Sequence, residues 1–190
     1  MKKALVLLAD GFEDVEAITP IDYLCRAGIE VITASITENL TVTSRWGGIK
    51  LTASVTLTSL DEQLSMNNDF DAVILPGGMP GAVNLAASEK VSKLLREMYD
   101  ADKLICAICA SPAVVLAPLG ILDGRRFTCY PGQEEKTPGL IHNWSEDFVV
   151  IDGNVITSRA AGTAGEFSIA IIEKMLDKTA ADKIADIVLM

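Results

Sequence analysis

Positive charge and histidine are both scarce in this chain of 190 residues. Lys and Arg together number 16 against 26 Asp and Glu, which gives a formal net charge of −10, and His142 is the single histidine. A protein that binds nucleic acid or an anionic membrane surface by electrostatic attraction needs a basic face. We therefore expect neither nucleic acid nor a membrane as a partner.

Long apolar runs and cysteines are also few. The N-terminal run 4–9, ALVLLA, ends at Asp10 without a signal-cleavage site after it, and no run approaches the roughly 20 apolar residues that span a bilayer. Four cysteines in a chain without a secretory signal are typical of reduced thiols rather than of a disulfide framework. These absences predict a cytoplasmic protein.

The hydrophobic pattern predicts one α/β domain over residues 1–190. Hydrophobic residues make up 49% of the chain and charged residues 22%, which is enough for one sizeable core. Short apolar runs that do not alternate with polar residues are typical of strands buried on both faces of a parallel sheet. We expect such strands at 3–9, 30–36, 70–76, 103–108 and 154–159.

Amphipathic stretches between these runs predict helices. They cover residues 13–28, 88–102, 111–120 and 162–177. Gly28 and Gly120 stand where a helix end needs a left-handed residue. Thr163 and Glu166 have the spacing of a capping box, which would start the last of these helices.

The stretch 40–55, LTVTSRWGGIKLTASV, breaks the alternation of strands and helices. A Gly47-Gly48 turn between two alternating runs predicts a β-hairpin that stands off the main sheet. The stretch 128–139 is rich in turn-forming residues and is expected to be a loop or short helix. The expected architecture is a sandwich of helices around a mostly parallel sheet, and ligands of such sheets bind beyond the carboxyl ends of the strands.

Three of the expected strands run into segments with unusual chemistry. These are DGFEDVE after the first strand, PGGMPG after the third and AICASP after the fourth. The last segment places Cys109 on a tight turn between strand and helix, where the helix dipole and free N–H groups favour a thiolate. Cys109 is therefore the candidate nucleophile. The alternative is a small buried residue that fills the turn, which is a common role of free cysteine.

Cys106 and Cys109 have the spacing of a CxxC motif, but we do not expect a redox pair. Such a pair opens a helix, whereas Cys106 would lie inside a strand. Three extended residues separate the two Cα atoms by about 10 Å, which exceeds the limit of about 7 Å for a disulfide. We expect the Cys106 side chain to point into the core between sheet and helix.

Four segments together resemble the DJ-1/ThiJ/PfpI superfamily, on its DJ-1 and YajL side. They are AICASP, LPGG with a further glycine after it, LADGFEDVEAITPIDYLCRAGIEV and TSRAAGTAGEFSIAIIE, in the family's order over nearly the whole chain. The resemblance implies a flavodoxin-like sandwich, a homodimer and a reactive cysteine at Cys109. It also implies an acidic residue from the first helix against that cysteine, and matching the motif G-x-E-x-x-E makes Glu16 this residue.

Glu16 and nearby backbone N–H groups would complete a catalytic site. A carboxyl held against a thiolate in a poorly solvated pocket has a raised pKa, and protonated Glu16 would hydrogen-bond the sulfur and lower the thiol pKa. The same group would serve as general acid or base. The N–H groups at Gly77, Gly78 and Ala110 would form an oxyanion hole. Alternatively, Glu16 is one of several acids favoured in the first turns of a helix.

Three further side chains are candidates for the pocket rim. Tyr130 stands where DJ-1-like relatives can have a histidine, and it would hydrogen-bond a substrate oxygen. Arg45 in the hairpin and Arg159 at the end of the last strand would bind an anion, contact a second subunit or form surface ion pairs. Cys129, in the loop before Tyr130, is a candidate second oxidisable thiol near the pocket or the dimer contact.

The position of the single histidine argues against peptidase and amidotransferase chemistry. His142 lies in GLIHNWSED, which is typical of a surface loop. Protease-like members of the superfamily have a histidine directly after the nucleophile, and Ala110 occupies that position here. Peptide hydrolysis and amidotransfer both need a Cys–His pair, so we expect neither activity.

The resemblance implies an enzyme that acts on small reactive carbonyl compounds without a metal or organic cofactor. The reaction would be that of a glutathione-independent glyoxalase, which converts methylglyoxal to a hydroxy acid, or that of a deglycase. The alternative is a redox sensor or chaperone that stabilises a sulfinic acid at Cys109. A third hypothesis is a hydratase-type activity on another small electrophile. The same residues serve each hypothesis, so the sequence leaves them open.

Overall fold

A mostly parallel sheet forms the centre of the computed structural model, which describes residues 1–46, 48–63 and 70–190. The strand order is β5-β2-β1-β6-β7-β9-β8, and only β8 runs antiparallel to its neighbour. The strands are β1 (Lys3–Leu8), β2 (Glu30–Ser35), β5 (Val55–Thr56), β6 (Ala72–Leu75), β7 (Leu104–Ile108), β8 (Val149–Asp152) and β9 (Val155–Ser158). The five predicted strands are thus confirmed, and so is the predicted fold class.

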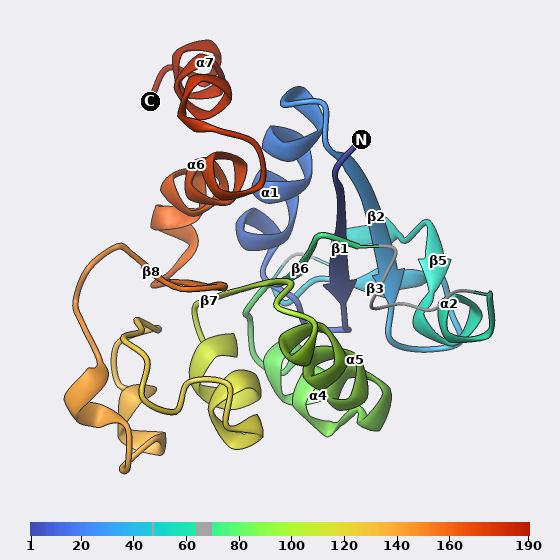
Figure 1. Ribbon diagram of the computed structural model, residues 1–190. Helices are drawn as coiled ribbons and strands as arrows, with labels where there is room; N and C mark the ends of the chain where they lie inside the picture. Colours follow the sequence, from blue (N-terminus) through green and yellow to red (C-terminus); the bar gives the residue numbers. More distant parts are fainter. Residues whose placement is uncertain (47, 64–69) are drawn as a thin grey trace.

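Helices cover both faces of the sheet (Figure 1). One side carries α1 (Asp14–Arg26), α6 (Ala164–Met175) and α7 (Lys178–Val188), and the other carries α4 (Gly81–Ala87) and α5 (Glu89–Asp100). The short α2 (Leu57–Gln63) follows β5 directly. No helix in these described ranges is long and apolar enough to cross a membrane.

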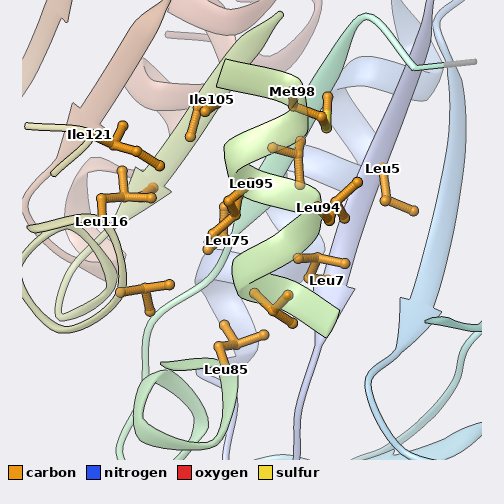
Figure 2. Packing of buried hydrophobic residues seen from close by; sticks show 14 of the residues in the cluster. Leu5, Leu7, Leu75, Leu85, Leu94, Leu95, Met98, Ile105, Leu116 and Ile121 are labelled. Atoms are coloured by element: carbon orange, nitrogen blue, oxygen red, sulfur yellow. The ribbon is translucent and has the colours of Figure 1, made fainter. Parts of the chain in front are cut away.

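Alternate residues of the strands enter two different cores. Leu5 and Leu7 of β1 pack with Leu94 and Leu95 of α5 (Figure 2), whereas Val6 packs on the opposite face with α1 and α6. All of these side chains are fully buried. Because burying one such side chain contributes roughly 1.5–3 kcal/mol, the two cores hold the strand ends at fixed positions.

The predicted helix after the Cys109 turn is not a regular α-helix. Pro112–Leu116 forms a π-helical turn and Ala117–Leu119 a 3-10 turn, which ends at Gly120 with a φ of 74°. Pro118 lacks the N–H that would continue an α-helical ladder, and its ring crowds the preceding turn. The left-handed end at Gly120 agrees with the prediction.

The predicted capping box at Thr163 and Glu166 is wrong. A 3-10 turn, Ala161–Thr163, precedes α6, and Thr163 makes no side-chain cap hydrogen bond to that helix. Its hydroxyl turns back instead, accepts the Ala160 N–H at 3.2 Å and lies 2.7 Å from the Ser158 hydroxyl. The threonine therefore closes the turn before the helix rather than the first turn of the helix.

The sequence patterns did not indicate β8, α2, α4 or α7. β8, α2 and α4 are short, and only two residues separate α7 from the end of α6. Ser88 both ends α4 and caps α5. Helix α1 ends as predicted, with Gly28 at a φ of 79°. The turn-rich stretch 128–139 is mostly loop, as predicted, and contains a 3-10 turn at Glu134–Lys136.

The predicted hairpin is confirmed as a separate sheet of β3 (Thr41–Thr43) and β4 (Lys50–Thr52), which pair antiparallel. Gly47 of its predicted turn lies outside the described residues. The Gly11 N–H donates to the Thr43 carbonyl at 2.8 Å, so the hairpin is tied to the loop that follows β1.

Candidate active site

The segments DGFEDVE, PGGMPG and AICASP meet at one edge of the sheet, because β1, β6 and β7 are parallel neighbours. Backbone hydrogen bonds join the first two segments: the Glu13 N–H donates to Gly77 O and the Gly81 N–H to Gly11 O, both at 3.1 Å. A Cβ at Gly78, whose φ is 88°, would lie 2.5 Å from Gly11 O. Only glycine allows this close approach.

Cys109 occupies the turn directly after β7 with a φ of 65°. This left-handed conformation costs a non-glycine residue about 1 kcal/mol or more, and such strain clusters at functional sites. The Cys109 N–H donates to Ser158 O at 2.9 Å, and its carbonyl accepts the Tyr130 N–H at 2.7 Å. The residue is 8% exposed. Its neighbours thus hold the cysteine in the predicted nucleophile position.

Glu16 lies against this cysteine and is 1% exposed. Its carboxylate accepts the Gly77 N–H at 2.9 Å and a backbone hydrogen bond from Ala161, and it also hydrogen-bonds Cys109. Burial raises the pKa of Glu16 to about 7, with a smaller rise from the charge of Glu13, while the three hydrogen bonds oppose the rise. The contact and the raised pKa agree with the prediction.

Burial also raises the pKa of the Cys109 thiol, and the charge and hydrogen bond of Glu16 raise it further. The prediction that Glu16 lowers this pKa is therefore wrong. The pocket is poorly hydrated, and two negative charges in contact within it repel. A thiol that keeps its proton must give it to a base when it reacts, and Glu16 is the carboxylate in contact with it.

Two backbone N–H groups, those of Gly78 and Ala110, hydrogen-bond the Cys109 sulfur and oppose the rise of its pKa. The predicted oxyanion hole also included Gly77, but its N–H donates to Glu16. A Cβ at Gly77 would lie 2.6 Å from both the Cys109 Cβ and Glu16 Oε2. A glycine is needed at this position for the acid and the thiol to touch.

Among the rim candidates, Tyr130 is joined to Cys109 directly, through its backbone N–H, and is 47% exposed. Arg45 stacks on Trp46, with its guanidinium carbon 4.1 Å from the ring centroid. Arg159 donates to the Glu146 carbonyl at 2.9 Å. Neither arginine forms an ion pair with another described residue.

The other cysteines are free thiols in different surroundings. Cys106 is fully buried in the core that faces α1 and α6, as predicted, and Cys25 is exposed on α1. Cys129 is also fully buried, with its sulfur 4.0 Å from Glu134 Oε2. Burial and the charge of Glu134 raise the pKa of the Cys129 thiol to about 12, which does not favour the predicted easy oxidation.

His142 lies in an exposed 3-10 turn, Ile141–Asn143, as predicted for a surface loop. In the part of the chain that the structure describes, no three His, Cys, Asp or Glu side chains come together in a way that could hold a metal ion. The titratable side chain that hydrogen-bonds Cys109 is the carboxyl of Glu16.

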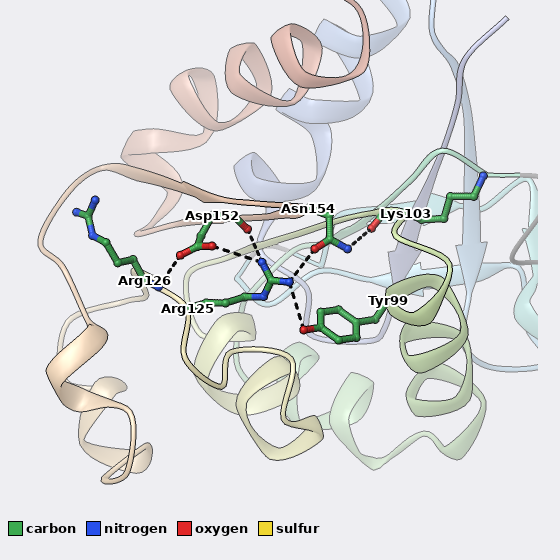
Figure 3. A network of polar contacts seen from close by, with 6 residues as sticks. All are labelled: Tyr99, Lys103, Arg125, Arg126, Asp152 and Asn154. Carbon is green, nitrogen blue, oxygen red and sulfur yellow. Dashed lines mark hydrogen bonds and ion pairs between the residues drawn. The ribbon is translucent and has the colours of Figure 1, made fainter.

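A cleft of about 640 Å³ lies at the opposite end of the sheet, at the amino ends of the strands. Its charged lining residues are Lys2, Asp71, Asp102, Lys103, Arg125 and Lys174. The Arg125 guanidinium donates to Asp152 O at 2.8 Å, Asn154 Oδ1 at 3.0 Å and Tyr99 Oη at 3.2 Å (Figure 3). This arginine joins α5 to the β8–β9 turn, and no cysteine is among the described residues that line the cleft.

The sequence of this site matches a known family. The model of the DJ-1/PfpI family matches residues 2–174, a range that contains both Glu16 and Cys109. The chain belongs to the DJ-1/PfpI family. A solved structure of oxidized DJ-1 from Toxoplasma gondii is 34% identical, covers 100% of this chain and 98% of that chain, and superposes with a TM-score of 0.92.

Curated members of the DJ-1/PfpI family differ in how much of their length this chain covers. The zebrafish protein named Parkinson disease protein 7 homolog is 38% identical over 96% of this chain and 94% of its own length. DJ-1 homolog B of Arabidopsis thaliana is 41% identical over 90% of this chain, which spans only 37% of that protein. A Pyrococcus abyssi protein named a deglycase is 36% identical over 84% of this chain and 91% of its own length.

The sequence patterns assigned no role to Ser158 or Ala161 and only a helix-capping role to Thr163, although all three lie in the family segment TSRAAGT. In the structure the Ser158 carbonyl accepts the Cys109 N–H, and the Ala161 N–H donates to the Glu16 carboxylate. These contacts use backbone atoms, so residue types and their spacing do not reveal them.

Proposed function

We propose that this chain is an enzyme acting on small reactive carbonyl compounds, as a glutathione-independent glyoxalase with deglycase activity on early glycation adducts. The observation that carries this proposal is the contact between Glu16 and Cys109, with the N–H groups of Gly78 and Ala110 at the sulfur. These groups can add a thiol to an aldehyde, stabilise an oxyanion and move a proton. The deglycase name of the archaeal relative supports the substrate class.

In the first step, the Cys109 sulfur attacks the aldehyde carbon of an α-oxoaldehyde such as methylglyoxal. Glu16 accepts the thiol proton, a C–S bond forms, and the aldehyde oxygen becomes an oxyanion. The N–H groups of Gly78 and Ala110 hydrogen-bond this oxyanion. Glu16 then returns the proton to this oxyanion, which gives a hemithioacetal and restores the Glu16 carboxylate, and Tyr130 hydrogen-bonds the neighbouring substrate oxygen.

In the second step, the Glu16 carboxylate removes the proton from the former aldehyde carbon, and a proton is then added to the neighbouring carbon. The first carbon is oxidised to a thioester while the ketone is reduced to an alcohol, so the substrate supplies both halves of the redox change. Water hydrolyses the thioester, which releases the hydroxy acid and restores the thiol. The net reaction converts methylglyoxal and water to lactate.

Lactate formation from methylglyoxal by metal-free protein, without glutathione, tests the proposal. We expect Cys109→Ser to lower kcat/KM by about 100-fold or more, because the sulfur forms the covalent bond. Cys106→Ser is the matched control, since this fully buried cysteine of the strand before the Cys109 turn faces the core. Wild-type activity no higher than that of Cys109→Ser would refute the glyoxalase reaction.

A second candidate function is a redox sensor or chaperone that works without turnover. The N–H groups of Gly78 and Ala110 would hydrogen-bond the oxygens of a sulfinate at Cys109, and the relative from Toxoplasma gondii was solved in an oxidized state. Mass spectrometry of peroxide-treated protein distinguishes the two functions. Addition of two oxygen atoms at Cys109, in protein that forms no lactate, favours the sensor.

We also propose that the chain forms a cytoplasmic homodimer. The four free cysteines support a reducing compartment. Apolar side chains exposed on α1 and the hairpin, among them Ile18 at 44% and Trp46 at 71%, support an interface with a second copy. Light scattering should give the mass of two chains for the wild type and of one chain for Trp46→Glu. A wild-type mass of one chain would refute the dimer.

A further inference from the structure

Two hydroxyl groups lie directly behind the reactive pair and take no part in the steps above. Ser158 ends β9 and is fully buried, and Thr163 ends the 3-10 turn before α6 and is 7% exposed. Their oxygens are 2.7 Å apart. Such a short contact between buried hydroxyls requires one of them to donate to the other.

Each of the two hydroxyls also has a backbone carbonyl within hydrogen-bond distance. The Ser158 hydroxyl lies 2.7 Å from the Phe148 carbonyl, and the Thr163 hydroxyl lies 2.9 Å from the Ala160 carbonyl. Because each hydroxyl has one proton, one donates to the other and the second donates to its own carbonyl, while the Thr163 oxygen also accepts the Ala160 N–H at 3.2 Å. A continuous chain therefore runs from Ala160 through Thr163 and Ser158 to Phe148.

This chain of hydrogen bonds reaches both members of the reactive pair. The Ser158 carbonyl accepts the Cys109 N–H at 2.9 Å and so fixes the strained turn of the nucleophile. The Ala160 N–H is held by Thr163, and the next N–H, that of Ala161, donates to the Glu16 carboxylate. Backbone groups of one short segment, 158–163, thus hydrogen-bond both Glu16 and Cys109.

We propose that the hydroxyls of Ser158 and Thr163 form a positioning pair, which holds the Ala161 N–H on the Glu16 carboxylate and thereby sets how readily Glu16 accepts the Cys109 proton. The inference deepens the proposed function, because it concerns the acid–base group of the same site. It also applies to the sensor, since both functions need Cys109 to lose its proton.

Loss of the Thr163 hydroxyl should raise the pKa of Glu16. The Ala161 N–H stabilises the ionised form of Glu16 and lowers its pKa, so a displaced turn raises that pKa above about 7. In the described residues, the titratable groups that act on Glu16 are Cys109 and Glu13, and none comes from α6, the helix that packs on α1. The variants leave both groups unchanged.

The test is the rate at which iodoacetamide alkylates Cys109 as a function of pH, followed by mass spectrometry of the peptide that contains Cys109. For Thr163→Val we expect the midpoint of the profile to move up by about half a pH unit, so that the rate on the acid side falls about threefold. Thr163→Ser keeps a hydroxyl and should restore the wild-type midpoint. Ser158→Ala should move the midpoint in the same direction as Thr163→Val, and it carries the test if the valine variant does not fold.

Ser168→Ala is the matched control, because this fully buried serine also donates its hydroxyl to a backbone carbonyl, that of Ala164, but only within α6. It should leave the midpoint unchanged. A folded Thr163→Val or Ser158→Ala protein with the wild-type midpoint would overturn the proposal, and so would an equal shift in Ser168→Ala. Alkylation needs no carbonyl turnover, so failure to form lactate would refute the proposed function and leave this test intact.

Discussion

At the scale of single residues, reactivity depends on how little water reaches Cys109 and Glu16. Burial raises the pKa of both groups, and their contact prevents both from being charged together. The thiol therefore keeps its proton at neutral pH, and once Glu16 is ionised, above a pH of about 7, that proton can move from sulfur to carboxylate when a substrate binds. In the proposed mechanism, Glu16 is the base that makes this buried thiol a nucleophile.

The rate of lactate formation should rise with pH through a value near 7, because Glu16 must be ionised to accept the thiol proton and its pKa is about 7. In Glu16→Gln this rise should disappear and the rate should fall about 100-fold or more. A pH series of kcat/KM checks this expectation. A variant with the wild-type profile would show that another group is the base.

Gly77→Ala should abolish most of the activity without unfolding the protein. The new Cβ would lie 2.6 Å from both the Cys109 Cβ and Glu16 Oε2, so the acid and thiol must separate. We expect kcat/KM to fall about tenfold or more, since loss of a positioned general base costs at least this much. Gly139→Ala, where a Cβ meets nothing within 4 Å, is the control and should retain activity.

At the scale of elements, apolar runs were enough to predict the five strands and the edge of the sheet where the site lies. Adjacent short elements were harder, because α4 leads into α5 through Ser88 alone. The Thr163–Glu166 spacing indicated a capping box, but the Thr163 hydroxyl lies 2.7 Å from the hydroxyl of Ser158, at the end of the preceding strand. The capping-box pattern describes only the first turn of a helix and does not include the turn before it.

Arg125 joins two elements at the opposite end of the sheet, and its loss should affect stability rather than activity. In Arg125→Gln the contacts to Asp152, Asn154 and Tyr99 are lost, and we expect the free energy of unfolding to fall by about 2 kcal/mol. Arg126→Gln is the matched control. Its exposed ion pair with Asp147 should contribute about 1 kcal/mol or less. If urea denaturation gave the same loss of unfolding free energy for Arg125→Gln and Arg126→Gln, this structural role of Arg125 would be contradicted.

At the scale of the whole molecule, the sheet separates a reactive end from a structural end. The resemblance of four segments was sufficient to predict the family and the contact between Cys109 and Glu16. It was not sufficient for the direction of the thiol pKa, because this depends on how completely the folded chain excludes water. The Gly77 N–H was predicted to belong to the oxyanion hole, but it donates to Glu16. The sequence did not indicate this partner, because Glu16 comes from a different element.

Because the pKa of Glu16 is raised in the folded state, the free energy of unfolding should depend on pH. The folded state holds this proton up to a pH of about 7, whereas the ordinary carboxyl releases it near 4.5. Stability should therefore fall between these values as pH rises, by about 3 kcal/mol, relative to Glu16→Gln. Chemical denaturation of both proteins over this range measures the difference. A difference that does not change with pH would contradict the buried, protonated carboxyl.

The central claim is that Cys109 and Glu16 act as one unit, and a double-mutant cycle tests it most directly. Lactate formation from methylglyoxal would be compared in wild type, Cys109→Ser, Glu16→Gln and the double variant. We expect the double variant to be no slower than Cys109→Ser alone, because the base has no function without the thiol. If the rate of the double variant fell by the product of the two single-variant losses, the two residues would act independently, which would contradict the account.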